Sequence, residues 1–333
     1  MAIKLCSYNI EWFDKLFNPD NSMKTTGEAT EKLDAIANVL TKVKADLVGI
    51  QEAPNSTASG TQSTVEKLEN FAAAYGLRTK KAKTGFISGG QQELAVLYDP
   101  DKLAVNHKPG GTNSKSNPKF NGELYIDTDD DRIKEVYKHY RPPMEANVKV
   151  QATGNEFRLI VAHTKSKGIF SSVDMVNLER ESRRSRLKIF AECSWIRKRV
   201  DEWLGQGHDV VVMGDINDGP GMDEYEMRFG RSGVEILMGS LFEPDAIMRN
   251  LAGRPKWGQY GWSPSSARFK DRITETYVNV LIDHILVSAG LKPSGANPHQ
   301  IWNPFGDDDE AKTIKDDLLK ASDHFPISIK LNV

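Results

Sequence analysis

The chain has 333 residues, of which 39% are hydrophobic and 27% are charged. This composition excludes an intrinsically disordered chain, and the length is enough to bury a large core in one layered α/β domain or in two average domains. The net charge of -2 at pH 7 excludes a general attraction to polyanions. Binding to a polyanion would therefore need a local basic patch or a metal ion.

Strand and helix patterns alternate along the chain. Short apolar runs that end in turn residues predict strands, at 3–12, 46–51, 93–98, 144–152, 156–164, 210–213, 280–288 and 327–331. Apolar residues at helical spacing predict helices, at about 25–44, 65–75 and 173–204, and a short one that ends near 320. The capping-box spacing of Thr25 and Glu28 marks the start of the first helix. No linker or repeat divides this series, so we expect one domain over residues 1–333.

Cysteine content and the distribution of apolar residues indicate the compartment. Cys6 and Cys193 are too few for a disulfide framework, which fits a reducing compartment. The first residues lead directly into a predicted strand and lack the apolar core of a signal peptide. No apolar run approaches the length of a membrane span. We expect a cytoplasmic protein without a membrane segment, unless a leader was removed from the chain.

Polar stretches between these elements leave alternatives open. The stretch 109–131 and the acidic run 307–310 predict exposed loops, and we assign no Ca²⁺ site to the acidic runs 127–131 and 307–310. Four arginines in the third helix predict a solvated helix face, with a basic patch as the alternative; they are Arg180, Arg183, Arg184 and Arg186.

Polar side chains collect where predicted strands end. Asp215 and Asn217 follow the buried run 210–213, in a segment rich in Gly, Asp and Pro. A carboxylate at that position is costly to bury unless a metal, a partner or a substrate meets it, although capping of backbone N–H groups is the alternative. Comparable positions are held by Asn9, Glu11, Glu52, His163, Asp283, Asp323 and His324. His284 follows Asp283 and should point to the opposite side of its strand.

These residue types predict metal-assisted chemistry on a phosphate. Carboxylates and amides without cysteine form an oxygen-rich site, which suits Mg²⁺ or Mn²⁺ better than zinc. Two histidines can supply protons or positive charge, and Arg141, Lys165 and Lys167 can hold a phosphate. The combination predicts phosphoryl transfer to water. Taken singly, each residue also has a structural alternative, such as a buried amide, a helix cap, a satisfied histidine or a solvated lysine.

Six motifs occur here in the order seen in the endonuclease/exonuclease/phosphatase superfamily, which the chain therefore resembles. They are Ser-Tyr-Asn-Ile-Glu-Trp at 7–12, Gly-Ile-Gln-Glu at 49–52, Ile-Val-Ala-His-Thr at 160–164, Gly-Asp-Ile-Asn-Asp at 214–218, Ile-Asp-His-Ile-Leu-Val-Ser at 282–288 and Ser-Asp-His-Phe-Pro at 322–326. The match extends from residue 4 to residue 331. The resemblance implies a four-layer α/β/β/α sandwich, with two mixed β-sheets face to face, helices outside and the active site at one end of the sheets.

The resemblance also implies roles for individual residues. Glu52 is then the principal ligand of Mg²⁺ or Mn²⁺, and the residues close to the metal are Asn9, Glu11 and Asp323. The implied catalytic residues flank the water and the scissile phosphate: His163, Asp215, Asn217, Asp283 and His324. Asp215, helped by Asn217, orients or deprotonates the attacking water. Asp283 keeps His324 in one tautomer and stabilises its imidazolium form.

The stretches Arg-Pro-Pro at 141–143 and His-Thr-Lys-Ser-Lys-Gly at 163–168 resemble nuclease-like members, particularly the bacterial extracellular nucleases. An arginine and two lysines beside a metal suit a polyanionic backbone better than a single head group. We therefore expect a phosphodiesterase, and more narrowly a nuclease that cleaves DNA or RNA. The slightly negative net charge and the missing secretion signal depart from the nuclease pattern.

Two other functions stay open at this stage. One is a phosphoesterase of the same chemistry that acts on a lipid head group or a small phosphorylated molecule. The other is a non-catalytic binding scaffold. An aromatic and basic region either stacks bases and holds phosphates or is a packed loop; its residues are Arg254, Lys256, Trp257, Tyr260, Trp262, Arg268 and Lys270. The sequence assigns neither oligomeric state nor endonuclease or exonuclease action.

Overall fold

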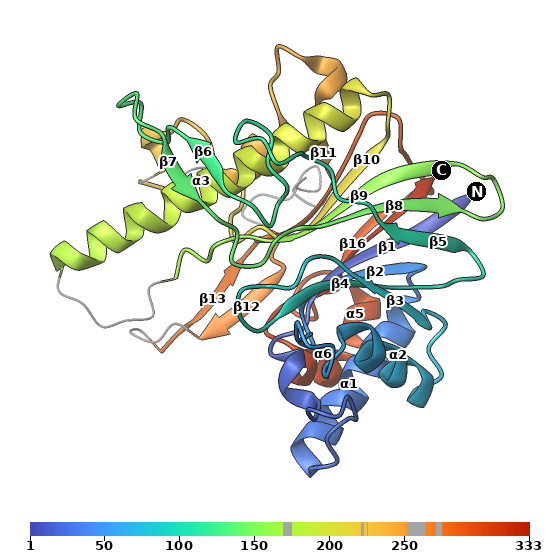
Figure 1. Cartoon of the computed structure of the whole chain (residues 1–333). Coiled ribbons are helices and arrows are strands. Elements are labelled where there is room, and N and C mark those ends of the chain that lie inside the picture. The colour runs from blue at the N-terminus through green and yellow to red at the C-terminus, as the bar shows by residue number, and fades with distance from the viewer. Residues whose placement is uncertain (169–174, 221–222, 225, 252–263, 271–274) are drawn as a thin grey trace.

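Two mixed β-sheets lie face to face in the computed structural model, with helices on the two outer sides (Figure 1). The structure describes residues 1–168, 175–220, 223–224, 226–251, 264–270 and 275–333. Within those ranges the arrangement is the expected four-layer α/β/β/α sandwich. Helix α3 covers the outer face of one sheet, and α1, α2, α5 and α6 lie on the outer side of the other.

The first sheet has the strand order β15-β17-β1-β2-β4-β3, and β16 also pairs with β17. Its strands are β1 (Ala2–Asn9), β2 (Leu47–Ala53), β3 (Lys81–Thr84), β4 (Glu93–Tyr98), β15 (Lys292–Pro293), β16 (His299–Ile301) and β17 (Ile327–Asn332). Strand β1 runs parallel to β2 and antiparallel to β17. The carboxyl ends of β1 and β2 therefore meet at the same end of the sheet.

The second sheet repeats this arrangement in the order β11-β14-β10-β9-β8-β5. Its strands are β5 (Leu103–His107), β8 (Met144–Val150), β9 (Glu156–His163), β10 (Val210–Asp215), β11 (Arg249–Asn250) and β14 (Asp283–Val287). Strand β10 runs parallel to β9 and antiparallel to β14. Two small hairpins lie outside the sheets: β6 (Leu124–Ile126) with β7 (Glu135–Tyr137), and β12 (Ala267–Lys270) with β13 (Tyr277–Val280).

The observed helices confirm those that the spacing of apolar residues predicted. They are α1 (Gly27–Val43), α2 (Thr64–Ala74), α3 (Met175–Gly205), α4 (Gly233–Met238), α5 (Asp309–Lys312) and α6 (Lys315–Ala321), with short 3₁₀ turns η1 (Phe13–Leu16), η2 (Glu226–Arg228) and η3 (Pro244–Ala246). Among these described helices, none combines the length and the apolar composition that crossing a membrane requires.

Alternating side chains build three apolar layers. In β10, Val211 and Met213 face the core between the sheets, whereas Val210 and Val212 face α3. In the same way, Leu5 of β1 faces the core between the sheets, whereas Cys6 faces the α1 side. Each sheet is therefore apolar on both faces, which explains why the central strands read as continuous hydrophobic runs.

Three local predictions were wrong in detail. Strand β1 ends at Asn9, and Trp12 adopts a left-handed backbone with φ 53°. The N-cap residue of α1 is Thr26, whose side chain makes no capping hydrogen bond, so the capping box predicted for Thr25 and Glu28 does not form. The stretch 109–131, expected as loop, contains β6, because a hairpin with β7 pairs its backbone.

Candidate active site

The carboxyl ends of parallel strands gather the expected site residues. Asn9 ends β1, His163 ends β9 and Asp215 ends β10, while Glu52 lies one residue before the end of β2. Asn9 Nδ2 donates to Asp215 Oδ2 at 3.0 Å. This hydrogen bond joins the first sheet to the second, so the carboxyl ends of both pairs of parallel strands lie at the same site.

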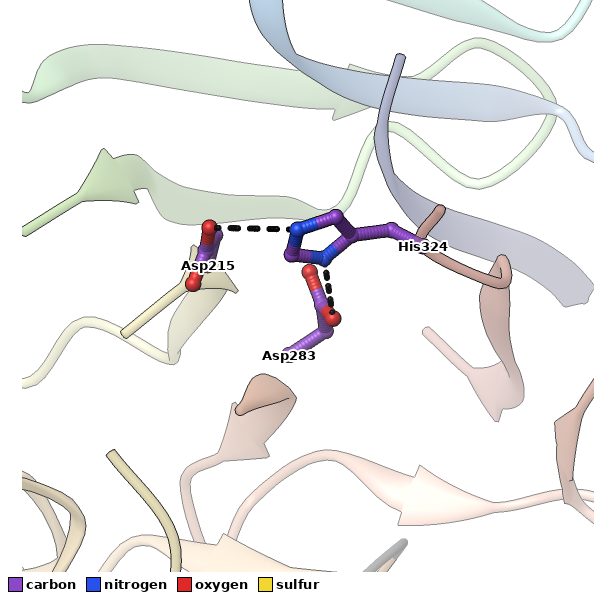
Figure 2. Close-up of side chains that lie close together, drawn as sticks. All are labelled: Asp215, Asp283 and His324. Atoms are coloured by element: carbon purple, nitrogen blue, oxygen red, sulfur yellow. Dashed lines mark hydrogen bonds and ion pairs between the residues drawn. The ribbon is translucent and has the colours of Figure 1, made fainter. Parts of the chain in front are cut away.

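Asp283 and His324 reach the site from antiparallel strands. Asp283 begins β14 directly opposite Asp215, and His324 lies shortly before β17. Figure 2 shows the imidazole between two carboxylates: its Nδ1 lies 2.8 Å from Asp283 Oδ2, and its Nε2 lies 3.8 Å from Asp215 Oδ2. Ser266 Oγ donates to the same Asp283 oxygen at 2.7 Å. These contacts fix the ring orientation and the tautomer of His324.

The carboxylate of Asp215 is held from both sides. His163 Nε2 lies 3.3 Å from its Oδ2, which also accepts from Asn9. Its Oδ1 accepts the backbone N–H of Asn217 at 2.8 Å, and Asn217 Nδ2 donates to the carbonyl of Thr164 at 3.1 Å. Asn217 thus ties the ends of β9 and β10 together and orients the carboxylate between them.

Burial and neighbouring charge move the pKa values of these groups apart. Burial raises the pKa of Asp215 to about 7, although the charge of His324 opposes the shift. Burial lowers the pKa of His324, but the carboxylates of Asp283, Asp215 and Asp323 outweigh it and raise that pKa to about 10. Burial and nearby positive charge lower the pKa of His163. At neutral pH the site therefore combines a protonated His324 with a neutral His163, which suits acid and base roles.

Glu52 adopts a backbone conformation that is uncommon for glutamate. Its φ is 60°, in the left-handed region, and the pairing of β2 with β4 is irregular between Ile50 and Ala53. A bulge of this kind re-aims a side chain that regular pleating would direct elsewhere. Glu52 Oε2 accepts the backbone N–H of Trp12 at 2.9 Å, which holds the carboxylate in place.

A short hydrogen-bonded chain connects Glu52 to a cation. Gln92 Nε2 donates to Glu52 Oε2 at 2.6 Å, and Arg141 Nη2 donates to Gln92 Oε1 at 2.5 Å. Burial raises the pKa of Glu52, while the charges of Arg141 and His324 oppose the shift. Arg141 also contributes to lowering the pKa of His163. The guanidinium therefore lies within electrostatic reach of both halves of the site.

The oxygen atoms of the first sheet fit a hard divalent cation. Among the described residues, Asn9 Oδ1 and Asp323 Oδ1 are buried without a hydrogen-bond partner. Such atoms are unfavourable unless a partner meets them. The charge of Asp323 also acts on the pKa of Glu52, so the two carboxylates are neighbours. One amide and two carboxylates are the donor set that Mg²⁺ and Mn²⁺ prefer.

Among the described residues, two other groups could hold a metal ion, and within each group the ligand atoms lie within 4.8 Å of one another. One consists of Asp215, Asp283 and His324; its imidazole already carries a proton between two carboxylates, so we interpret it as a proton-transfer group. The other is the acidic run 127–131 with Glu135. There the Asp127 carboxylate accepts backbone N–H groups of its own loop at 2.8 to 3.2 Å, and we assign no ion.

Two of the expected residues have partners of their own. The Glu11 carboxylate lies 3.6 Å from the ammonium of Lys32. Lys165 donates its backbone N–H to buried Glu192 at 2.7 Å, and burial together with the charge of Lys188 lowers the pKa of its ammonium. A metal-binding role for Glu11 and a phosphate-binding role for Lys165 stay predictions.

Lys167 lies among carboxylates. Its Nζ is 2.5 Å from Asp218 and 3.7 Å from Asp223, and it also contacts Glu226. These partners raise the pKa of Lys167 against the opposing effect of burial, which is the largest single influence. Its predicted contact with a substrate phosphate would require the ammonium to leave these contacts.

Sequence reasoning missed three residues that orient the site, and two of them carried no signal. Gln92 links Glu52 to Arg141, and Ser266 donates to Asp283. Both lie in polar loops without a motif, so only the three-dimensional contacts reveal them. The third, Ser322, was within reach of the Ser-Asp-His motif: its Oγ donates to the Asn9 carbonyl at 2.8 Å.

The aromatic and basic region is only partly described. The residues outside the described ranges are Arg254, Lys256, Trp257, Tyr260 and Trp262. Arg268 is described, and its guanidinium lies 3.8 Å from the ring centroid of Tyr277 and 4.1 Å from that of Phe305. Lys270 pairs with Glu275 at 3.7 Å. Both residues lie in the β12–β13 hairpin, and the base-stacking role of this region stays a prediction.

His284 lies away from the site, as predicted. Its Nε2 is 2.8 Å from the carbonyl of Asp218 and its Nδ1 is 2.9 Å from Asn250 Nδ2. Burial lowers its pKa. It is a satisfied structural histidine next to a site residue.

The fold is that of the endonuclease/exonuclease/phosphatase proteins, as the motifs predicted. TDP2 from C. elegans superposes with a TM-score of 0.54 at 14% identity, over 100% of this chain and 76% of that one. An endonuclease/exonuclease/phosphatase family protein from Bacteroides thetaiotaomicron gives 0.50 at 14%, over 99% and 97% of the two chains. D. rerio TDP2, complexed with single strand DNA product, gives 0.51 at 13%, over 100% and 99%. No family model matches the sequence, and no curated protein is similar to it in sequence.

Proposed function

We propose that the chain is a divalent-metal-dependent phosphodiester hydrolase that cleaves nucleic acid. The observation that carries this proposal is the hydrogen-bonded and ion-paired series Asp283–His324–Asp215–His163, buried where the two sheets open. The core shared by both sheets supports a single domain spanning residues 1–333.

The chemistry follows from the protonation states. Asp215, whose pKa burial raises to about 7, accepts a proton from water as the water oxygen attacks phosphorus. His324, protonated at neutral pH, offers its Nε2 proton to a phosphate oxygen or to the leaving oxygen when the P–O bond breaks. Asp283 stabilises the imidazolium, and His163 holds Asp215 from the opposite side.

Glu52, Asn9 and Asp323 would hold Mg²⁺ or Mn²⁺. A bound divalent cation supplies positive charge that offsets the negative charge that builds on the phosphate oxygens. Arg141 adds a guanidinium, a geometry that matches phosphate. Its position between Gln92 and His163 places that charge beside the reacting groups.

Nucleic acid is the substrate that the local charges favour. Arg141 and Lys165 bring positive charge to a chain whose overall charge is slightly negative. A protein of the same fold, D. rerio TDP2, is complexed with single strand DNA product. A lipid head group or a small phosphoester finds no specific support among the described residues.

The test is a metal-dependent activity panel with plasmid DNA, single strands, RNA and bis-p-nitrophenyl phosphate. We expect cleavage with Mg²⁺ or Mn²⁺, none after chelation, and loss of activity by at least about 10³-fold in Glu52→Gln and His324→Ala. His284→Ala is the matched control, because that buried histidine lies away from the site. Intact nucleic acids with turnover of sphingomyelin or inositol phosphates would favour the small-substrate alternative. No hydrolysis and no binding of divalent cations would favour a scaffold.

A further inference from the structure

A pocket lined by α3 and the β6–β7 hairpin, which lie side by side in Figure 1, contains none of the site residues. Its volume is about 670 Å³. Five cationic side chains line it, against two carboxylates, those of Asp129 and Glu135. The cations are Lys138, Arg180, Arg183, Arg184 and Lys188. Five cations against two carboxylates give the lining residues a net charge of +3, on a chain whose net charge is -2.

Repulsion between like charges destabilises α3 at this pocket. Arg180, Arg184 and Lys188 follow one another at intervals of four residues, which places like charges next to each other on one face. Each such pair destabilises an isolated helix by a few tenths of a kcal/mol. Glu181 and Glu192 of the same helix offset part of this repulsion, and an anionic ligand would offset the rest.

Lys138 lies 2.8 Å from Glu123 and Arg183 lies 3.4 Å from Asp129, whereas Arg180 and Arg184 are only loosely compensated. Arg180 Nε and Arg184 Nη1 each lie 4.0 Å from one carboxylate, that of Glu181, and the two side chains are 70% and 80% exposed. By contrast, Arg186 of the same helix lies 2.7 Å from Asp223 and is 13% exposed. Arg186 serves the fold, whereas Arg180 and Arg184 remain available to a ligand.

The inner end of the pocket leads to the site through three contacts. Lys188 Nζ, which lines the pocket, lies 3.8 Å from Glu192 Oε1. Glu192 Oε2 accepts the backbone N–H of Lys165 at 2.7 Å. Lys165 follows His163 by two residues, and His163 contacts Asp215 at 3.3 Å. The side chain of Glu192 and the backbone of Lys165 thus connect the pocket to the reacting groups.

We propose that this pocket binds backbone phosphates of a nucleic acid strand whose scissile phosphate lies at Asp215 and His324. The inference rests on the proposed function and adds to it a preference for polymeric over small phosphodiesters. From Arg180 to Lys188 the helix rises about 12 Å, which corresponds to about three phosphates at the spacing along one DNA strand. Phosphate contacts of this kind position a strand without reading its sequence.

The test compares two substrates in one variant. We expect Arg180→Gln/Arg184→Gln to lower, by about tenfold, the ratio of kcat/KM for an oligonucleotide of about 12 nucleotides to that for bis-p-nitrophenyl phosphate. The dependence of log KM on log salt concentration should also become shallower by about 1.5. Lys42→Gln/Lys330→Gln removes the same charge from a different pocket, at the opposite end of β1, and should keep the ratio.

Oligonucleotide binding, measured by fluorescence anisotropy on the same proteins, separates this inference from the proposed function. If the wild type hydrolyses neither substrate, the proposed function fails, and weaker binding in the arginine variant alone still supports the pocket. An unchanged ratio with unchanged binding overturns the inference, as does an equal loss in the lysine control. Binding of anionic vesicles that the arginine variant loses, with oligonucleotide binding intact, would overturn it in favour of a membrane surface.

Discussion

Replacing Asp283 with asparagine tests the charge balance around His324. Asp283 Oδ2 lies 2.8 Å from His324 Nδ1, and both side chains are buried. Asparagine keeps the volume and can still accept a hydrogen bond through its amide oxygen. It removes the negative charge that stabilises the imidazolium, so any change that follows reports on that charge.

The expected magnitude follows from the pKa of His324. The difference between its ordinary value of 6.5 and about 10 corresponds to about 5 kcal/mol. Asp283 supplies the two largest of the effects that raise the pKa, so its share is at least about half of that free energy. Because the folded-state pKa lies above the unfolded value, this stabilisation is fully present below pH 6.5, declines above it, and is lost once the pH passes about 10.

Urea unfolding in the absence of divalent metal measures the effect. We expect Asp283→Asn to lower the free energy of unfolding by about 2 kcal/mol or more near pH 6, and by only about 1 kcal/mol near pH 9. Asp46→Asn is the matched control, because Asp46 is a buried carboxylate that pairs with Arg78 and Lys102 and not with a histidine. If both variants lose the same free energy at the two pH values, the charge explanation is wrong.

Three further outcomes test the fold around the site. In Gly214→Ala a Cβ would lie 1.9 Å from the Ala162 carbonyl oxygen at φ +147°, so we expect a loss of about 3 kcal/mol or more and a visibly lower melting temperature. Burial raises the pKa of Glu192 to about 7, so the neutral form is favoured and wild-type stability falls as the pH rises from 4.5 through 7. Glu192→Gln should therefore gain up to about 3 kcal/mol relative to wild type between those pH values in urea unfolding, and a constant difference would contradict this. Arg199 contacts Glu145, and both are fully buried, so Arg199→Ala should cost about 3–5 kcal/mol in the same assay, whereas a loss below about 1 kcal/mol would refute the uncompensated-charge argument.

The strand ends could be predicted because their signals are local. A run of apolar residues followed by Gly, Asp or Asn marks the end of a buried strand, and Asp215 and Asn217 follow such a run. Parallel pairing then brings Asn9 and His163 to the same end of the sandwich. The meeting of the two sheets, visible in the bond from Asn9 to Asp215, is a consequence of the whole fold, which only the order of the motifs indicated.

The residues that orient the site could not be predicted, because their partners are distant in sequence. Gln92 lies 40 residues from Glu52 and 49 from Arg141, and it bridges them only after β4 pairs with β2. Lys167 illustrates the converse. Its motif predicts contact with a phosphate. In the structure its ammonium instead contacts the carboxylates of Asp218 and Glu226, which follow β10 in the chain.

Backbone strain at the site explains why these side chains are arranged before any substrate arrives. Four of the nine non-glycine residues with positive φ in the described part of the chain lie here: Trp12, Glu52, Gln92 and Asn217. A left-handed backbone at such residues costs about 1–3 kcal/mol each and persists only when surrounding contacts fix it. The contacts are those that hold the two carboxylates, since Trp12 and Gln92 donate to Glu52, and Asn217 donates to Asp215. The strained backbone thus accompanies a fixed orientation of the two acidic groups, so under the proposed function neither would have to reorganise during the reaction.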